Sequence, residues 1–390
     1  MEIAKRQQSN IKKIVIILAI ICLALILRLS LIEHRSGDFD HYTGRWYEFI
    51  VNNGGFNALK FPFSNHNVPY QYLLVIVYYL FPGLPTLAAT KVSSILFDFI
   101  GAFVVAQLVR LKYPGFRMPT LAFAIALFTP TVVINSSAWG QSDFIYTTFL
   151  LACTYFLCKR QEIWAAIAFG LALAFKLQAM FLSPILFVLL LKRFLSWRFC
   201  LIVPITYVVM LLPAWIAGRP FKELLLIYFQ QANTYDDLTK HAPNLYQWIS
   251  DDYYAIFSVL GLLITAFLVV VFAAWLYRIR TQVNPNFIIR IAMISALAVP
   301  YFLPKMHERY FFVADLLSVI FAFYFPRYFF LPIVIIASSL LSYAPFMLGE
   351  LFVSLKVQSL FLLAVLIFLL RELNSYLQQQ SKLLEVEPQH

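Results

Sequence analysis

The sequence has 390 residues, of which 62% are hydrophobic and 13% charged, and its 30 Lys and Arg against 19 Asp and Glu give a net charge of +11. Soluble globular proteins are about 45–50% apolar and about a quarter charged, so the composition excludes a soluble enzyme, a disordered chain and a secreted disulfide-rich protein. A basic excess can mark nucleic-acid binding, but a chain this apolar offers no broad polar surface to a duplex. An integral membrane protein without a nucleic-acid partner remains.

Long apolar runs predict an all-α polytopic protein with about twelve membrane-spanning helices. Lipid offers backbone groups no hydrogen-bond partner, so apolar runs of about 17–25 residues span a bilayer as helices. The predicted spans are residues 14–32, 87–109, 119–135, 143–158, 163–175, 178–191, 199–217, 254–276, 287–303, 311–325, 328–346 and 356–370. The first run lacks a small-residue cleavage site, so we interpret it as a retained span rather than a signal peptide.

The apolar segment 68–81 decides the topology. Counting it as a crossing would place Arg110, Lys112 and Arg117 outside, in conflict with the basic pair that follows the span 143–158. We therefore predict a re-entrant or interfacial helix for 68–81. The basic loops then lie in the cytoplasm, as the positive-inside rule requires.

This topology predicts the organisation of the chain. Residues 1–13 form a cytoplasmic tail, 14–217 a membrane module whose first external loop is 33–86, 218–253 a second large external loop, 254–370 the C-terminal membrane helices, and 371–390 a second cytoplasmic tail. Shorter external turns lie at 136–142, around Lys176, and at 304–310. The polar groups thus gather on one face, and the basic excess becomes a signal of orientation and of contact with membrane lipids.

The first external loop opens with two carboxylates, Asp38 and Asp40, between Arg35 and His41. A carboxylate at the membrane surface can deprotonate a hydroxyl while nearby cations hold a phosphate. The alternative is a solvated loop in which an aspartate caps the following helix. The cluster alone does not distinguish the two.

Two further turns carry candidate residues on the same face. In Trp139-Gly140-Gln141-Ser142-Asp143 the aspartate can be a helix cap and the tryptophan an interfacial anchor, or both can belong to a site. Lys176, followed by Gln178, can snorkel to the interface, but its external position favours an anion partner.

Residues 304–310 place Lys305, His307, Glu308 and Arg309 between two apolar spans. So many ionisable groups in a short turn favour function over a structural role. Zinc spacing of the HExxH type is absent, because Phe311 stands four residues after His307. Asp98 and Asp315, within or near spans, are interpreted as groups that bond one helix to another rather than as proton relays.

Three of these motifs resemble those of the GT-C superfamily of polyprenyl-phosphate-sugar-dependent glycosyltransferases. Gly37-Asp38-Phe39-Asp40 with Trp46 is similar to the acidic motif of the first external loop. The segments 139–143 and 307–309 resemble the second-turn motif and the His-Glu-basic motif. The chain looks most like lipid-phosphate-glucose-dependent glucosyltransferases of N-glycan assembly and bacterial proteins related to GPI mannosyltransferases. Those relatives often have a double proline at a position where this chain has only Pro69.

The resemblance implies a GT-C-like bundle with juxtamembrane helices in the first loop and an inverting transfer of glucose or mannose from a polyprenyl-phosphate donor. The acceptor would be lipid-linked or a glycan, on the non-cytoplasmic face of, most simply, a bacterial inner membrane. It also implies roles: Asp38 as base with Asp40 as the alternative, Lys176, His307, Arg309 and Lys305 on the donor phosphate, and Trp139, Gln141, Asp143, Gln178 and Glu308 in positioning.

Some questions stay open at this stage. No cofactor is expected to be obligatory, although Asp40 and Asp143 could together hold a divalent cation. A secondary transporter or flippase is the main alternative, and an inactive scaffold of a glycan-assembly complex is another. Polar groups gathered at one face, without two matched half-repeats, favour the enzyme.

Overall fold

A computed structural model describes residues 2–232 and 236–386 of the chain. Residue 1 of the predicted first tail, 233–235 of the predicted second loop and 387–390 of the predicted last tail lie outside the described residues. The described chain is almost entirely helical, with one pair of two-residue strands. The prediction of an all-α polytopic membrane protein is confirmed.

The α-helices and strands have the following bounds: α1 Glu2–Ser30, α2 Gly44–Asn52, α3 Val68–Leu80, α4 Thr86–Lys112, α5 Arg117–Phe128, α6 Pro130–Val133, α7 Asp143–Cys158, α8 Glu162–Phe175, α9 Ser183–Leu191, α10 Trp197–Ile216, α11 Phe221–Ala232, β1 Thr239–Lys240, α12 Tyr254–Arg278, α13 Pro285–Phe302, β2 Met306–His307, α14 Phe312–Tyr324, α15 Phe330–Leu348 and α16 Leu355–Val386. Short helical turns join them: η1 Phe39–Thr43, η2 Gly55–Lys60, η3 Ile134–Trp139, η4 Leu177–Leu182, η5 Leu245–Trp248, η6 Asp251–Tyr253, η7 Glu308–Phe311 and η8 Pro326–Tyr328.

Every predicted span is helical in the structure. Among the described residues, seven helices are long and apolar enough to cross a membrane, or eight if the bent pair 117–128 and 130–139 forms one span. Helices α3, α7 and α8 and the segment 177–191 are apolar but shorter. Helix α1 begins at Glu2 and α16 runs to Val386, so helix extends through parts of the chain that we predict as tails.

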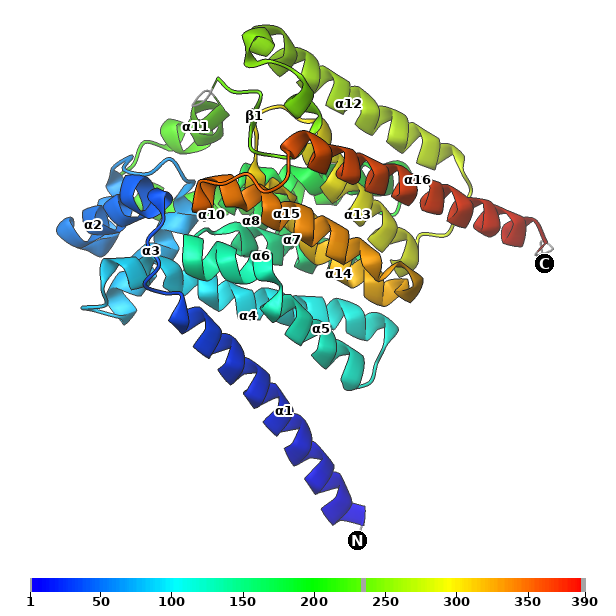
Figure 1. Cartoon of the computed structure of the whole chain (residues 1–390), viewed down its shortest axis with the longest axis horizontal. Helices are drawn as coiled ribbons and strands as arrows, with labels where there is room; N and C mark the ends of the chain where they lie inside the picture. The colour runs from blue at the N-terminus through cyan, green and yellow to red at the C-terminus, as the bar shows by residue number, and fades with distance from the viewer. Residues whose placement is uncertain (1, 233–235, 387–390) are drawn as a thin grey trace.

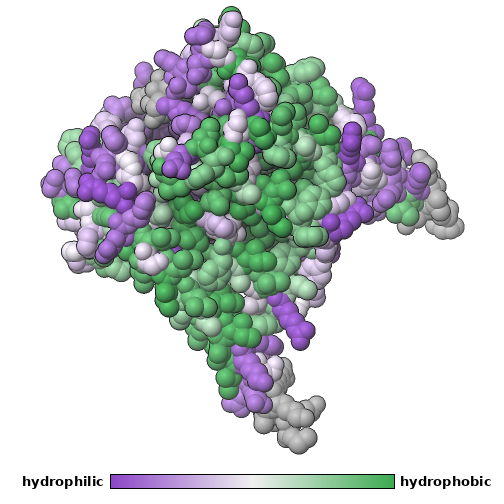
Figure 2. All heavy atoms as spheres, viewed as in Figure 1, coloured by the Kyte–Doolittle hydropathy of each residue, from purple (hydrophilic) through white to green (hydrophobic). Residues whose placement is uncertain are grey.

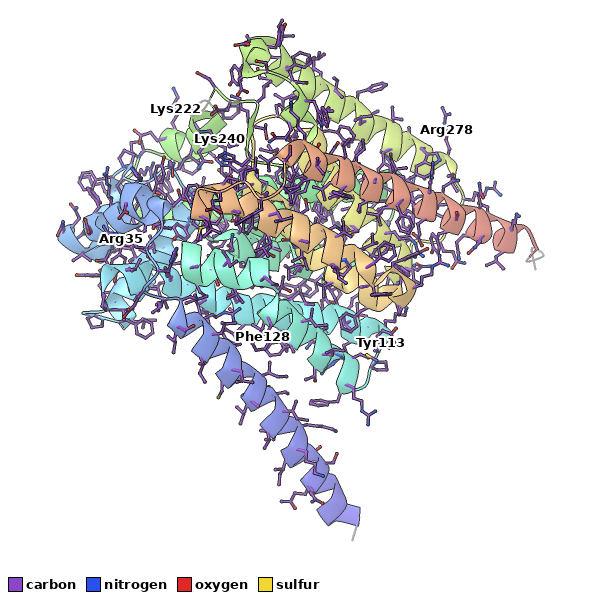
Figure 3. The ribbon with its side chains drawn as sticks, in the orientation of Figure 1. Arg35, Tyr113, Phe128, Lys222, Lys240 and Arg278 are labelled. Atoms are coloured by element: carbon purple, nitrogen blue, oxygen red, sulfur yellow. The ribbon has the colours of Figure 1, made fainter. Side chains whose placement is uncertain are left out.

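Most of the helices run side by side between two ends of the molecule, and α1 diverges from them (Figure 1). Helices α2, α3 and α11 lie at one end, and the C-terminal end of α16 lies at the other. Hydrophobic residues cover the surface between the ends, whereas hydrophilic residues gather at the ends (Figure 2). Arg35, Lys222 and Lys240 lie at the first end, and Tyr113 and Arg278 at the second (Figure 3). The two loops that we predict as external therefore share one end of the molecule.

The core sits around α7, α13 and α14, which are buried along most of their length. Helices α1 and α12 lie on the outside and expose large aliphatic side chains along most of their length, as a lipid-facing helix requires.

Buried polar contacts join the helices. The Arg28 side chain of α1 donates to Asp98 Oδ2 of α4 at 2.7 Å, and both side chains are fully buried. Ser136 Oγ donates to the same oxygen at 2.6 Å. Deeper in the bundle, Ser339 Oγ donates to Asp315 Oδ1 at 2.8 Å. Both aspartates thus bond one helix to another.

Candidate functional site

Asp38 lies where α1 gives way to the first loop, and two side chains from the turn before α7 hold its carboxylate. The indole Nε1 of Trp139 donates to Asp38 Oδ2 at 2.8 Å, and Gln141 Nε2 donates to the same oxygen at 2.5 Å. The carboxylate is partly exposed. It is therefore fixed in direction while one oxygen stays available to a substrate.

The backbone around Asp38 is anchored from both sides. Ser36 Oγ donates to the Trp139 carbonyl at 2.8 Å and accepts from the Phe39 N–H at 3.3 Å. The buried ammonium of Lys91, from α4, donates to the carbonyls of Ile32 (2.9 Å) and His34 (2.6 Å). This cation satisfies carbonyls of the segment that follows the C-terminal end of α1.

The turn that carries Trp139 is a π-type turn, η3, which ends at Gly140. Gly140 has a φ of +80°, a conformation that side chains with a Cβ rarely adopt. This sharp exit lets the Gln141 N–H donate to the Asn135 carbonyl at 2.8 Å, so Trp139 and Gln141 both point at Asp38. Turns of the π type are frequent at functional sites.

Asp143 is the centre of a second cluster and is completely buried at the start of α7. Lys176 Nζ donates to its Oδ1, while Asn135 Nδ2 donates to Oδ2 at 2.9 Å. Arg309 Nε lies 3.5 Å from Oδ2. Asp143 thus holds two cations from distant parts of the chain.

Both cations keep donors for a ligand. Lys176 spends one of its three N–H donors on Asp143, and its ammonium lies 5.6 Å from the ring centroids of Tyr146 and Tyr310. Arg309 donates Nη1 to Glu308 at 2.8 Å, whereas its buried Nε makes no hydrogen bond among the described residues. The pair can bind an anionic oxygen without releasing Asp143.

The segment that carries Arg309 is positioned by the strand pair. Lys305 has a φ of +62°, and its N–H donates to the Leu238 carbonyl at 2.7 Å. Met306 and His307 then pair in parallel with Thr239 and Lys240. The second large loop therefore fixes the position of Glu308 and Arg309 through this strand pairing.

The electrostatics of this segment follow from burial and close charges. Burial opposes the positive charge of Arg309, but Glu308 and Asp143 outweigh it and raise its pKa. Burial lowers the pKa of Lys176, and Asp143 partly offsets the effect. Burial, aided by Arg309, holds the pKa of His307 well below its usual value, so His307 is neutral at neutral pH. Burial raises the pKa of Glu308 despite Arg309.

Trp139 joins the two clusters. The Arg309 guanidinium lies 5.4 Å from the centroid of the indole whose Nε1 bonds to Asp38. The indole also stacks on Phe346 at a centroid distance of 4.6 Å. One rigid ring thus contacts the Asp38 carboxylate at its edge and the Arg309 guanidinium over its face.

The structure leaves three sequence candidates apart from these clusters. Asp40 is exposed and pairs with Arg35 at 2.5 Å rather than with Asp38. The Lys305 ammonium lies over the ring of Tyr254, 4.9 Å from its centroid. The Gln178 side chain makes no hydrogen bond within the described part of the chain.

A cation shared by Asp40 and Asp143 has no support in this geometry. Asp40 is engaged by Arg35, and both oxygens of Asp143 already face Lys176, Arg309 or Asn135. Among the side chains that the structure describes, no group of three or more His, Cys, Asp or Glu could hold a metal ion.

Two further residues, Lys91 and His66, lie close to the site and are not among the candidates predicted from the sequence. Lys91 looks like an isolated charge near a helix end, and only the fold shows that it meets the end of α1. His66 comes just before Asn67 and Pro69, which are a recognisable helix start, and its ring lies near Lys176 and Arg309. That helix-start pattern was the available signal for His66.

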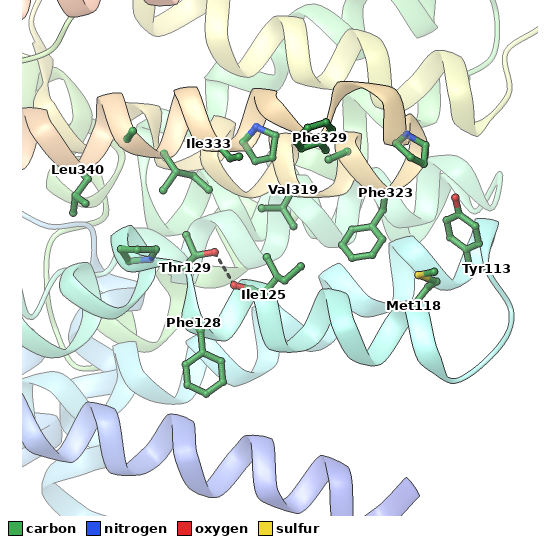
Figure 4. A pocket seen from close by; sticks show the side chains of 16 residues that line it. Tyr113, Met118, Ile125, Phe128, Thr129, Val319, Phe323, Phe329, Ile333 and Leu340 are labelled. Atoms are coloured by element: carbon green, nitrogen blue, oxygen red, sulfur yellow. Dashed lines mark hydrogen bonds between the residues drawn. The ribbon is translucent and has the colours of Figure 1, made fainter.

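An apolar groove of about 770 Å³ runs between α5, α14 and α15 (Figure 4). It extends from Tyr113 and Met118 to Pro130 and Leu340 and is lined almost entirely by aliphatic and aromatic side chains. Leu340 lies about one helical turn before Tyr343, whose ring packs on Trp139 at a centroid distance of 5.4 Å. The groove therefore leads along the membrane region towards the site.

No protein-family model and no curated protein sequence matches the chain. A crystal structure described as ArnT from Cupriavidus metallidurans bound to undecaprenyl phosphate is similar to it, with a TM-score of 0.54 and 12% identity over 93% of this chain and 77% of that chain. The match shows a shared fold, and the predicted GT-C-like architecture is confirmed at that level.

Proposed function

We propose that this membrane protein is a glycosyltransferase that transfers a hexose, glucose or mannose, from a polyprenyl-phosphate donor to a lipid-linked or glycan acceptor, with inversion. One observation carries the proposal: the Asp38 carboxylate is bonded to the edge of the Trp139 indole, and the same ring contacts Arg309, which shares Asp143 with Lys176. This arrangement combines a base with a phosphate site at one polar end of a GT-C fold.

In the proposed reaction, one oxygen of Asp38 takes the proton of the acceptor hydroxyl as its oxygen attacks the anomeric carbon. The bond between that carbon and the phosphate oxygen breaks, and polyprenyl phosphate leaves with one more negative charge. Lys176 and Arg309 stabilise the charge that develops, because their donors are fixed before the reaction begins. These two side chains supply the positive charge themselves, so we propose a transfer that does not need a divalent cation.

We propose that the isoprenoid chain of the donor occupies the groove between α5, α14 and α15. The groove is apolar along its length, faces the membrane region and ends about one helical turn from Tyr343, which packs on Trp139. The ArnT structure to which this fold is similar is described as bound to undecaprenyl phosphate, a lipid of the same class.

The direct test is transfer by the purified protein in lipid nanodiscs. Undecaprenyl phosphates carrying labelled glucose or mannose would be supplied with a lipid-linked glycan extract, with and without a chelator. We expect one of the two donors to transfer its label to the acceptor lipid, and we expect the same transfer when the chelator is present. Movement of intact donor across the bilayer without transfer would instead identify a flippase, the main alternative.

We also propose that the site faces the non-cytoplasmic side of a bacterial plasma membrane. Single cysteines at the exposed positions Lys222 and Asp252 should react with an impermeant reagent added to whole cells, in a variant without the four native cysteines. Cysteines at Arg117 and Arg278, at the basic end, should react only after lysis. The reverse pattern would place the site in the cytoplasm.

A further inference from the structure

The backbone of His66 is fixed just before α3. Its N–H donates to Ser64 Oγ at 3.0 Å, and its carbonyl accepts from Gln71 Nε2 at 3.1 Å. The imidazole packs against Trp46 and Tyr70, with ring centroids 5.0 Å away in both cases. A ring held on two sides in this way presents its nitrogens in a fixed direction.

The position of His66 is tied to that of Lys176. Asn67 Nδ2 donates to the Ala174 carbonyl at 2.8 Å, and Tyr228 Oη, from α11, donates to the Leu173 carbonyl at 2.5 Å. These bonds attach the start of α3 to the last turn of α8, directly before Lys176. The residue before Asn67, His66, is therefore held close to the segment that carries Lys176.

The ring nitrogens of His66 are available to a ligand. The imidazole is partly exposed, and neither ring nitrogen has a hydrogen-bond partner among the described residues. Burial, together with the charges of Lys176 and Arg309, lowers the pKa of His66 to about 3. At neutral pH the ring is therefore uncharged, with one N–H donor and one acceptor nitrogen.

A neutral donor–acceptor group beside two cations suits a hydroxyl better than a phosphate. The phosphate of a polyprenyl-phosphate sugar is drawn to Lys176 and Arg309, and only one bridging oxygen separates that phosphate from the sugar ring. The ring must then lie within a few ångströms of the cations, on the substrate side of the site. His66 offers a fixed hydrogen-bonding edge there that does not compete for the phosphate.

We propose that His66 binds a hydroxyl of the donor sugar and helps to determine which sugar is accepted. This inference rests on the proposed function and extends it from the phosphate to the sugar. Buried groups that pair with a hydroxyl discriminate strongly, because a ligand without that hydroxyl leaves them unsatisfied.

The test compares the binding of bare undecaprenyl phosphate with that of its glucose and mannose esters to the purified full-length protein. In the wild type, we expect at least one ester to bind more tightly than the bare phosphate. His66→Phe should weaken that ester at least tenfold and change the bare phosphate less than twofold. His66→Gln, which keeps a donor and an acceptor, should recover part of the loss. His34→Phe, on the exposed loop, is the matched control.

Each of the other outcomes contradicts either the proposed function or the assignment of His66. If the wild type binds neither bare nor glycosylated polyprenyl phosphate, the donor class is wrong and the proposed function fails. If the esters bind but no more tightly than bare phosphate, or if His66→Phe weakens both kinds of ligand equally, the assignment of His66 fails and the proposed function stands.

Discussion

The Trp139 indole donates a hydrogen bond of 2.8 Å to Asp38 Oδ2, although 101 residues separate the two in sequence. The bond joins the first external loop to the turn before α7 and selects one carboxylate of the acidic motif. Asp40, two residues further on, points to Arg35 instead. This difference in partners is the reason that we propose Asp38, rather than Asp40, as the base.

Asp38→Asn should abolish sugar transfer, because the amide cannot accept the hydroxyl proton. We expect a loss of at least 100-fold in kcat, within the range by which general bases accelerate reactions. Asp40→Asn should retain most of the activity. Transfer rates with saturating donor decide the point, and the opposite ranking of the two variants would make Asp40 the base.

Lys176 and Asp143 should behave as one unit. Lys176→Met removes a donor aimed at the leaving phosphate, and a loss of about 100- to 1000-fold in kcat is typical for such groups. Asp143→Asn should cost less, about tenfold, because Asp143 acts by holding Lys176 and Arg309.

The double variant provides the decisive comparison. Lys176→Met combined with Asp143→Asn should lose less than the sum of the two single losses, because the part of the Asp143 effect that acts through Lys176 is already lost, whereas the part that acts through Arg309 remains. Lys222→Met, an exposed lysine at the same end of the molecule, is the control and should retain activity. Fully additive losses would show that Asp143 has a separate role.

The architecture and the three motifs could be predicted because they depend on local patterns. Apolar runs fix the spans, and polar residues at one face stand out against lipid. The pairings Asp38–Trp139 and Lys176–Asp143 could not be predicted, since they depend on how α1, α7 and α8 pack. The positions of His66 and Lys91 close to the site could not be predicted for the same reason, because each is a single polar residue whose partners lie far away in the sequence.

The buried pair Arg28–Asp98 predicts a large effect on stability. Arg28→Met leaves the Asp98 carboxylate buried without its cation, which typically costs about 3–5 kcal/mol. The double variant Arg28→Met/Asp98→Leu removes both charges and should recover most of that loss. Thermal unfolding in detergent, followed by intrinsic fluorescence, measures both. A single variant as stable as the wild type would show that Asp98 is protonated in the folded protein.

The low pKa of His66 predicts a loss of stability in mild acid. The unfolded chain binds a proton at this residue near pH 6.5, whereas the folded protein does so only near pH 3. The contribution of the neutral His66 ring to the free energy of unfolding is therefore fully present above pH 6.5. Below pH 6.5 it falls by up to about 1.4 kcal/mol per pH unit. His307, whose pKa is also lowered, acts in the same direction, and Glu308, whose pKa is raised, opposes both.

Comparing variants isolates the contribution of His66. Unfolding temperatures measured between pH 7.5 and 5.0 should fall less steeply for His66→Phe than for the wild type. Equal slopes for the two proteins would mean that the His66 ring is protonated within the folded site.

The groove predicts an effect that depends on the length of the donor lipid. Ala337 lies on α15 within the groove, and its side chain is small and exposed. Ala337→Trp should fill part of the volume and raise the KM for an undecaprenyl-phosphate donor about tenfold, since a displaced isoprenoid chain loses about 0.8 kcal/mol for each buried methylene group. Ala266→Trp, on the lipid-facing surface of α12, is the matched control and should leave KM unchanged. With a citronellyl-phosphate donor, whose short chain fills much less of the groove, the difference in KM between wild type and Ala337→Trp should become smaller. A penalty that persists with the short donor and instead follows the chain length of the acceptor would assign the groove to the acceptor lipid.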